Sequence, residues 1–317
     1  MEKIKKFLEN NDNFLLTTHI NADGDAYAST LAVAQILKKL NKSYRIILPD
    51  SSKENRFSFL PFFEEVECYD NSNSYSRFEA AVICDAPGEN RIPGVLSLLP
   101  PHEFRLKIDH HPAENSLAGV NLLDVTASSA SKLVYHVVKS FYGMMDQNLA
   151  TTIYAGISYD TGRFSFSNTS PEDYLIAAEL MEYNVNISEI NDKMFFSYNP
   201  IALKVIGYGL SSLELLENGQ IGLIYIPNYL LKEVNSGDID ELANYSVGIN
   251  GVKVGIYIRE ISDHSFKISL RTRTDIPVNQ VAAVFGGGGH VKAAGCRIEG
   301  SYETVLNKLV NEIKKYW

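Results

Sequence analysis

The sequence predicts an α/β protein in which a parallel sheet with flanking helices is joined by a long helix to a smaller α+β domain. Over roughly the first half of the chain, apolar runs alternate with helical patterns, which is typical of βαβ units and parallel strands. From about residue 220 the pattern changes to strands that surround short helices. A length of 317 residues allows two domains. We therefore expect a first domain at 1–195, a helical linker at 196–218 and a second domain at 219–317.

The first domain opens with a short helix and a strand–helix–strand unit. The near-continuous apolar run Ala80–Asp85 is typical of a central parallel strand that is buried on both faces. The run Phe104–Asp109 instead alternates with period two. Two further strands are expected, at 14–18 and 44–49. Helices are expected at 2–9, from the acidic loop to about 40, at 126–142 and at 146–160, and the pattern at 171–216 is helical without a sheet signal. Residues 50–63 are expected to form an aromatic-rich loop packed on the core.

The second domain is expected to mix strands and helices. Alternating apolar residues predict strands at 220–226, 252–259 and 266–273, and helical spacing predicts helices at 278–285 and 302–316. We find neither an internal repeat nor a low-complexity segment.

Composition and charge exclude several classes of protein. Hydrophobic residues make up 45% of the chain, which is enough for packed cores. The first ten residues lack the apolar core of a signal peptide, and no apolar run approaches the roughly 20 residues of a membrane helix. Three widely spaced cysteines argue against a disulfide framework. A net charge of −9 disfavours a long nucleic-acid track but not a short anionic substrate. We expect a cytoplasmic protein without a membrane partner.

A short acidic loop follows the first predicted strand. His19, Asp23 and Asp25 lie between that strand and a helix, and Gly24 allows a tight bend between the two acids. In α/β sheets, ligands bind at the carboxyl ends of strands. Two carboxylates and an imidazole there suit a divalent metal, because without a cation the acids repel each other. The alternative is a solvated turn in which one Asp caps the helix.

Three further segments bring acids or histidines to the end of a predicted element. Asp85 ends the central strand, Asp109-His110-His111 ends the following strand, and Asp160 lies where a helix stops. Imidazole is a common ligand for borderline metals, and a neighbouring carboxylate can orient its ring. We therefore assign the Asp-His-His triplet a catalytic or metal-binding role.

Two features close to these acids are candidates for anion binding. The hydroxyl-rich run 126–131 opens a helix, where it serves either as a cap or as a phosphate site made of free N–H groups. Arg163 either binds a phosphate oxygen or pairs with a surface acid. The sequence leaves both alternatives open.

A glycine run stands out in the second domain. Gly286–Gly289 precede His290 and lie between ordered apolar segments, which argues against a flexible linker. Consecutive glycines expose backbone N–H groups and allow an anion to approach closely. Arg271 and Arg273, expected on one face of the preceding strand, could bind the same ligand.

These motifs, taken in order, resemble those of the DHH phosphoesterase superfamily. The matching segments are Thr18–Asp25, Asp85, Asp109–His111 and Asp160–Gly162, and Gly286–His290 resembles the glycine-rich motif of the accompanying DHHA1 domain. The resemblance covers nearly the whole chain, and its length and second domain are similar to the NrnA-type oligoribonucleases. Two departures, Ala22 where the family usually has Pro and Ala28 where it usually has Gly, supply no side-chain ligand.

The resemblance implies two divalent metal ions, most often manganese. Mixed imidazole and carboxylate ligands also suit Mn²⁺ better than a thiolate-seeking metal. Transferred by position, one ion is held by His19, Asp23 and Asp85, and the other by Asp25, Asp85, His110 and Asp160, so that Asp85 bridges. Asp109 is then expected to orient a ligand, and His111 to contact the substrate or the metal water. The implied catalytic residues are Asp85, Asp109, His110 and His111, and the implied substrate-binding residues are Arg163, Arg271, Arg273, Gly287, Gly288, Gly289 and His290.

The same resemblance implies a hydrolase for very short RNA oligonucleotides and 3′-phosphoadenosine 5′-phosphate that activates a bridging water with two metals. A phosphodiesterase for cyclic di-AMP or its linear product pApA remains an alternative, and so does an inactive nucleotide-binding module. A pyrophosphatase is disfavoured by the glycine-rich second domain. The expected partner is short RNA or a small nucleotide, and relatives are often homodimers through the first domain.

Overall fold

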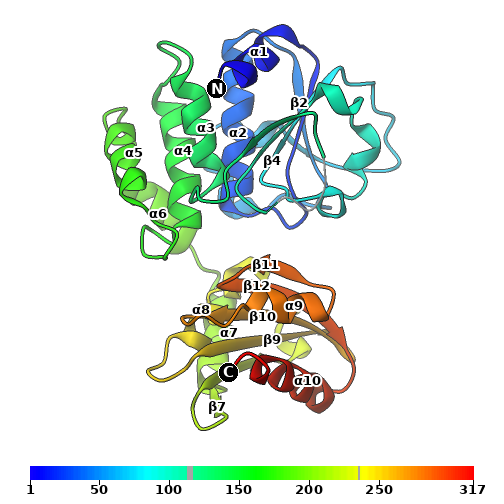
Figure 1. Cartoon of the computed structure of the whole chain (residues 1–317), viewed down its shortest axis with the longest axis vertical. Helices are drawn as coiled ribbons and strands as arrows, with labels where there is room; N and C mark the ends of the chain where they lie inside the picture. The colour runs from blue at the N-terminus through cyan, green and yellow to red at the C-terminus, as the bar shows by residue number, and fades with distance from the viewer. Residues whose placement is uncertain (113–116, 235) are drawn as a thin grey trace. The chain divides into compact units, whose positions relative to one another are not determined.

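The computed structural model describes residues 1–112, 117–234 and 236–317, which form two units, each with its own six-stranded sheet (Figure 1). The first unit covers Met1–Ser197 and the second Tyr198–Trp317. The α/β prediction is confirmed: the first sheet is entirely parallel and flanked by helices, and the second unit is smaller and mixes helices with a largely antiparallel sheet.

The sheet of the first unit has the strand order β3-β2-β1-β4-β5-β6. The buried strands β1 and β4 lie at its centre, where they pair in register from Phe14 beside Ala80 to Thr17 beside Ile83. Two short strands at 66–68 and 120–123 were not predicted, because three or four residues give too little pattern to detect. The strands are β1 (Phe14–Thr17), β2 (Tyr44–Leu48), β3 (Val66–Cys68), β4 (Ala80–Cys84), β5 (Arg105–Asp109) and β6 (Val120–Leu123).

Helix α2 packs against the central strands of this sheet and against α3 and α4, and α3 also packs against β5 (Figure 1). Every residue of α2 from Gly24 to Leu37 is buried, which explains its weak amphipathic pattern. The helix expected at 126–142 begins only at Ala130, because the Ser129 hydroxyl accepts the N–H of Lys132 and caps it there. The helices are α1 (Glu2–Asn10), α2 (Gly24–Lys39), α3 (Ala130–Lys139), α4 (Gln147–Asp160), α5 (Pro171–Met181) and α6 (Ile187–Phe195).

The period-two alternation of β5 does not mark an exposed face. The strand is buried on both faces, and the Lys107 side chain is only 1% exposed. Its ammonium group donates to the Pro87 carbonyl at 2.8 Å and lies 3.0 Å from Asp109 Oδ2. Lys107 and Asp109 therefore form a buried ion pair.

The sheet of the second unit has the order β11-β12-β10-β9-β8-β7, in which only β8 and β9 pair in parallel. Helices α9 and α10 pack on one apolar core and α7 and α8 on another. The strands are β7 (Glu214–Leu216), β8 (Ile221–Ile226), β9 (Val254–Ser262), β10 (Ser265–Thr272), β11 (Gly288–His290) and β12 (Ala293–Glu299), and the helices are α7 (Pro200–Ser211), α8 (Leu242–Val247), α9 (Val278–Val284) and α10 (Tyr302–Lys314).

The expected single long connection at 196–218 is not present as one helix. Helix α7 has 12 residues, and β7 follows it and pairs with β8 in an antiparallel hairpin. Glu217, Asn218 and Gly219 all have positive φ in the turn between them. Asn-Gly between apolar runs is a hairpin signal that the sequence analysis overlooked.

None of the helices in the described ranges is both long and apolar enough to cross a membrane. The three cysteines, Cys68, Cys84 and Cys296, are free, as predicted.

Candidate metal centre

The predicted ligands of the first unit gather at the carboxyl edge of its sheet. The chain adds strands β2 and β3 on one side of β1, and then adds β4, β5 and β6 on the other side. The point between β1 and β4 is therefore a topological switch point, where α/β sheets bind ligands. His19 lies in the loop after β1, and Asp85 follows β4 directly. Asp109 ends β5, and Asp160 is the last residue of α4.

Asp23 caps α2 through one oxygen and directs the other toward His19. Its Oδ1 accepts the backbone N–H groups of Asp25 and Ala26, each at 3.0 Å, and so caps α2. Its Oδ2 lies 4.0 Å from His19 Nε2. Because the two roles use different oxygens, the cap leaves Oδ2 available to a metal.

Asp85 lies at the centre of three histidines. Its Oδ2 is 3.6 Å from His19 Nε2, and its Oδ1 is 3.4 Å from His110 Nε2 and 3.3 Å from His111 Nδ1. Asp85 is 2% exposed and has a φ of 52°, a left-handed conformation that is uncommon outside glycine and occurs at functional sites. This turn directs the carboxylate into the cluster.

Asp25 is held by the amino end of α3. Its two oxygens accept the N–H groups of Ala130 at 2.6 Å and Ser131 at 2.9 Å, and the residue is fully buried. The anion at this helix end is therefore a carboxylate of the protein itself. This resolves the alternative posed by the hydroxyl-rich run, since the N–H groups of Ala130 and Ser131 are already occupied.

Two sets of side chains could each hold a metal. His19, Asp23 and Asp85 form one set, and Asp25, His110 and Asp160 form another; within each set the ligand atoms lie within 4.8 Å of one another. Asp85, Asp109 and His111 form a third such group, which overlaps the first at Asp85. His110 Nε2 is 3.2 Å from Asp160 Oδ2, and its Nδ1 is 3.2 Å from the Ala127 carbonyl. A carbonyl at Nδ1 favours the neutral tautomer with the lone pair on Nε2, the nitrogen that faces Asp85 and Asp160.

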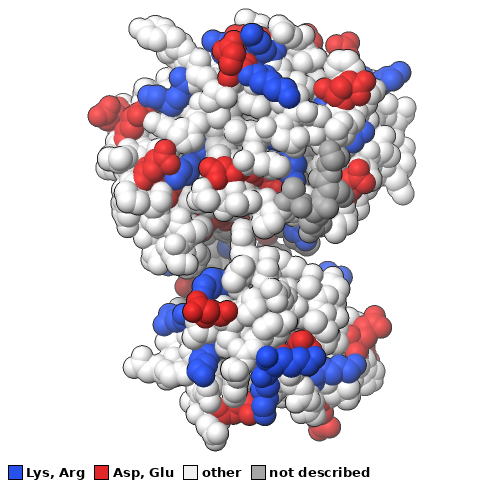
Figure 2. All heavy atoms as spheres, in the orientation of Figure 1, with Lys and Arg blue, Asp and Glu red and all other residues white. Residues whose placement is uncertain are grey.

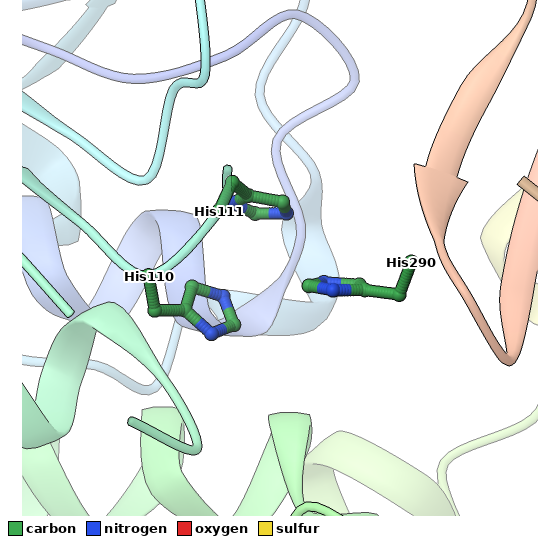
Figure 3. A group of neighbouring side chains, drawn as sticks. All are labelled: His110, His111 and His290. Atoms are coloured by element: carbon green, nitrogen blue, oxygen red, sulfur yellow. The ribbon is translucent and has the colours of Figure 1, made fainter. Parts of the chain in front are cut away.

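The third histidine is oriented by Asp109. Asp109 Oδ1 accepts the His111 backbone N–H at 3.0 Å and lies 2.9 Å from Nδ1 of its ring. Figure 3 shows the rings of His110 and His111, which meet edge to face with centroids 4.5 Å apart. Lys107 in turn pairs with the other oxygen of Asp109. The geometry agrees with the positioning role predicted for Asp109.

The electrostatics of the cluster suit a bound cation. Burial would raise the pKa of Asp85, but His110, His111 and His19 outweigh burial and hold it well below its usual range. Burial and the charge of Asp85 raise the pKa of Asp25 to about 7, and burial and Asp25 raise that of Asp160. The acids cannot all ionise at neutral pH without a compensating cation. Oxygen and imidazole donors without thiolate fit a hard or borderline divalent ion.

Metal affinity is expected to rise with pH. Burial lowers the pKa of His110, but Asp85 and Asp160 outweigh it and raise that pKa to about 10. The ring is then protonated at neutral pH and must lose its proton to bind a metal. Each proton released makes the affinity rise about tenfold per pH unit. Calorimetric titration with Mn²⁺ from about pH 6.5 to 8.5 measures this slope, and an affinity independent of pH would contradict the assignment of His110 as a ligand.

Asp50 is a residue of this region that the sequence analysis missed. It lies two residues beyond β2 and accepts the N–H of Asn21 at 2.7 Å and that of Ala22 at 3.3 Å. Asn21 has a φ of 57°, so Asp50 stabilises an unusual turn just before Asp23. Asp50 could have been found from its position shortly after a predicted strand, which is the same signal that identified Asp85.

In the second unit the glycine run is not the open loop that was expected. The N–H of Gly286 bonds to Ala283 and that of Gly287 to Ala282, a Schellman cap in which Gly286 has a φ of 74°. Gly288–His290 then form β11, paired with β12. Cap and strand pairing therefore engage part of the backbone that was predicted to bind an anion.

A methyl group at Gly287 is expected to destabilise the second unit. A Cβ there would lie 2.2 Å from the Gly295 carbonyl oxygen, whereas a Cβ at Gly288 would meet nothing within 4 Å. We expect Gly287→Ala to lower the free energy of unfolding by about 1–3 kcal/mol, since overpacking forces the backbone to shift. Gly288→Ala is the matched control. Denaturant unfolding measures both, and equal stability of the two variants would contradict the packing argument.

The remaining predicted substrate residues are placed as follows. Arg163 is exposed and has a φ of 59°, and its guanidinium lies over the rings of Phe195 and Phe196 at 5.0 and 5.2 Å. Arg271 is on β10, where it donates to the Leu270 carbonyl. Arg273 is exposed one residue beyond β10, so the strand alternation used to place both arginines on one face does not extend to it. His290 is exposed on β11.

Comparison with known proteins gives two domain matches and several full-length relatives. The DHH family, N-terminal domain, matches residues 13–157, and the DHHA1 domain matches residues 224–317. The chain is 30% identical to the bifunctional oligoribonuclease and PAP phosphatase NrnA of Thermus thermophilus, over 95% of this chain and 90% of that protein. It is 29% identical to the protein of the same name from Bacillus subtilis, over 90% of each.

Among solved structures, an exopolyphosphatase-related protein from Bacteroides fragilis has the same fold. The TM-score is 0.90 at 24% identity, with 99% of this chain and 95% of that chain covered. The matched domains, the ordered motifs and the identity to the NrnA proteins agree. The chain therefore belongs to the DHH/DHHA1 phosphoesterase family, in which the NrnA proteins are its relatives.

Proposed function

We propose that this protein is a metal-dependent phosphoesterase that hydrolyses very short RNA oligonucleotides and 3′-phosphoadenosine 5′-phosphate. The observation that carries the proposal is the cluster of three histidines around the buried Asp85 at the switch point of the sheet. The NrnA relatives, which are named for both oligoribonuclease and PAP phosphatase activity, support this choice of substrates. We place the activity in the cytoplasm, where free thiols such as Cys68 persist.

Two divalent ions, manganese in our proposal, would be held by the residue sets described above. His19, Asp23 and Asp85 form the first set, and Asp25, His110 and Asp160 form the second. Asp85 faces both, since its two oxygens point to different histidines. Bound there, the ions would polarise the phosphoryl group and supply a water acidic enough to attack at neutral pH.

The protein side chains hold this arrangement rigid. Asp25 is fixed by two N–H groups of α3, and Asp23 by the amino end of α2. Asp109 holds His111 through Nδ1 of its ring, and in our proposal Nε2 of that ring donates to a phosphate oxygen. Fixed donors that need no reorganisation contribute strongly to stabilising charge in a transition state.

Small substrates agree with the charge distribution. On the face seen in Figure 2, Lys and Arg are interspersed with Asp and Glu on both units. The net charge is −9. A polymeric nucleic acid needs many phosphate contacts from basic residues, whereas a nucleotide or a very short oligomer needs few.

A loss of His290 is expected to weaken substrate binding, because we propose that the second unit binds the nucleotide. His290→Ala should raise KM for a dinucleotide about tenfold, the effect of losing one charge-assisted hydrogen bond. Hydrolysis of a small generic phosphodiester should change little. Steady-state kinetics on both substrates decide, with Arg297→Ala, an exposed change on the neighbouring β12, as the control. Equal loss on both substrates would contradict a binding role.

A substrate panel tests the proposed function directly. The full chain with Mn²⁺ is offered RNA of two to five nucleotides, long RNA, 3′-phosphoadenosine 5′-phosphate, cyclic di-AMP, pApA and pyrophosphate. We expect turnover of the shortest RNAs and of 3′-phosphoadenosine 5′-phosphate to exceed that of long RNA and pyrophosphate. Preference for cyclic di-AMP or pApA would favour the dinucleotide phosphodiesterase instead. No turnover of any compound would leave a nucleotide-binding module.

A further inference from the structure

Arg91 is fastened to the metal-binding loop, although no motif identified it. It ends a short 3-10 turn, η3 (Glu89–Arg91), in the segment that follows Asp85. Its carbonyl accepts the N–H of Ile20 at 2.7 Å, and its own N–H donates to Gly88 at 3.1 Å. Ile20, which follows His19 in the chain, thus holds the backbone of Arg91. The Arg91 side chain is half-buried.

The guanidinium of Arg91 reaches the ring of His19. Its Nη2 lies 3.5 Å from His19 Nδ1, which is its only hydrogen-bond contact with a side chain within residues 1–112, 117–234 and 236–317. No carboxylate in those ranges forms an ion pair with it. Lys107, by contrast, is paired with Asp109, and Arg163 stacks on aromatic rings.

The contact with His19 is not a true hydrogen bond once the tautomer is considered. Nε2 faces Asp23 and Asp85, so a metal held with them needs Nε2 without a proton. The proton is then on Nδ1, which donates to the Ile20 carbonyl 2.9 Å away. If the ring is doubly protonated, Nδ1 carries a proton as well. In either state Nδ1 has no lone pair to accept from Arg91.

A half-buried guanidinium with no acceptor among the described residues is suited to binding an external anion. Removing a charge from water is costly unless it is paired. The planar fork of arginine matches phosphate oxygens with two parallel hydrogen bonds. Arg91 lies beside His19, six residues after Asp85 in the chain. This position puts the guanidinium next to the candidate metal centre.

We propose that Arg91 binds a non-bridging oxygen of the phosphate group that is hydrolysed, as a substrate-binding residue beside His19. This proposal rests on the phosphoesterase function proposed above. It assigns Arg91 to the reacting phosphate, distinct from the nucleotide contacts proposed for the second unit. Charge and geometry would both contribute, so a lysine should serve only in part.

Phosphate binding next to the metal tests the role of Arg91 without turnover. The full chain is loaded with Mn²⁺, and inorganic phosphate is titrated while paramagnetic broadening of its phosphorus NMR signal is followed, because that broadening reports only phosphate close to the ion. We expect Arg91→Ala to weaken this binding about 10- to 100-fold. Arg91→Lys should recover part of the loss. Arg45→Ala is the control, because Arg45 lies near the opposite end of the strands and pairs with Glu67.

A second measurement distinguishes phosphate binding by Arg91 from a role of Arg91 in holding His19 in place. Affinity for Mn²⁺, measured by electron paramagnetic resonance, should be the same in the wild type and both Arg91 variants. A parallel loss of Mn²⁺ affinity would overturn the proposal and make Arg91 a support for His19. Unchanged phosphate binding in Arg91→Ala, or no phosphate binding by the wild type, would overturn it as well. Failure of the substrate panel alone would overturn the proposed hydrolytic function and not phosphate binding by Arg91.

Discussion

Replacing Asp85 by Asn is expected to lower kcat by about 10³-fold or more while the protein remains folded. Metal ions contribute several kcal/mol of charge stabilisation to hydrolysis, and about 4 kcal/mol corresponds to 10³-fold in rate. Asp85 is the acid that both candidate metal sets approach, through His19 on one oxygen and His110 on the other. Losing its charge should therefore weaken both ions at once.

Asn is the appropriate replacement because Asp85 has a φ of 52°. Asn tolerates the left-handed conformation, whereas Ala would add backbone strain and confuse the result. Asp124→Asn is the matched control, since Asp124 is exposed directly after the neighbouring strand β6 and lies outside the candidate metal sets. Initial rates and Mn²⁺ titration compare the variants. Activity retained by Asp85→Asn would contradict the whole assignment of the centre.

Asp25→Ala is expected both to abolish hydrolysis and to destabilise the metal-free protein. The carboxylate accepts two buried N–H groups, those of Ala130 and Ser131, and its removal leaves both unsatisfied. Each unsatisfied buried group costs about 1–3 kcal/mol, so we expect the free energy of unfolding to fall by about 2–4 kcal/mol. Denaturant unfolding in the presence of a chelator measures this effect without a contribution from metal.

The control for Asp25 is Ser129→Ala, which removes the ordinary cap of α3. A lost cap costs about 1 kcal/mol, and this change should leave metal ligation intact. If Asp25→Ala were no less stable than Ser129→Ala in chelator, Asp25 would not anchor the helix. The comparison distinguishes a ligand that also supports the fold from one that only binds metal.

Much of the candidate centre could be predicted because its residues occur in recognisable local patterns. Asp85 ends an apolar run and Asp109 ends an alternating run, and a strand delivers its last residue to one edge of a parallel sheet. Element type followed from periodicity for most long segments, but the seven-residue strand β12 was not predicted, and β3 and β6 were too short to give a signal. The gathering of His19, Asp85 and His110 agrees with prediction; their binding of a metal stays a prediction.

Other features depended on partners far away in the chain. Asp25 meets Ala130 and Ser131, more than a hundred residues later, and no local pattern announces that contact. Lys107 lies at a polar position of an alternating run, and only its pairing with Asp109 shows that both faces of β5 are buried. The glycine run was predicted to be a loop, because four consecutive glycines look the same in the sequence whether they form a loop or a helix cap followed by a short strand.

The sequence by itself determined the two-domain α/β organisation, the family and the set of acids and histidines in the first unit. These follow from periodicity and from residues at the ends of elements, which are local properties. Only the tertiary structure decided that Asp25 anchors α3, that three of the four glycines are required by a cap or by close packing, and that Arg91 reaches His19. The physical reason is that a hydrogen bond or an ion pair is specified by the separation of two groups in space, and that separation depends on the packing of whole elements.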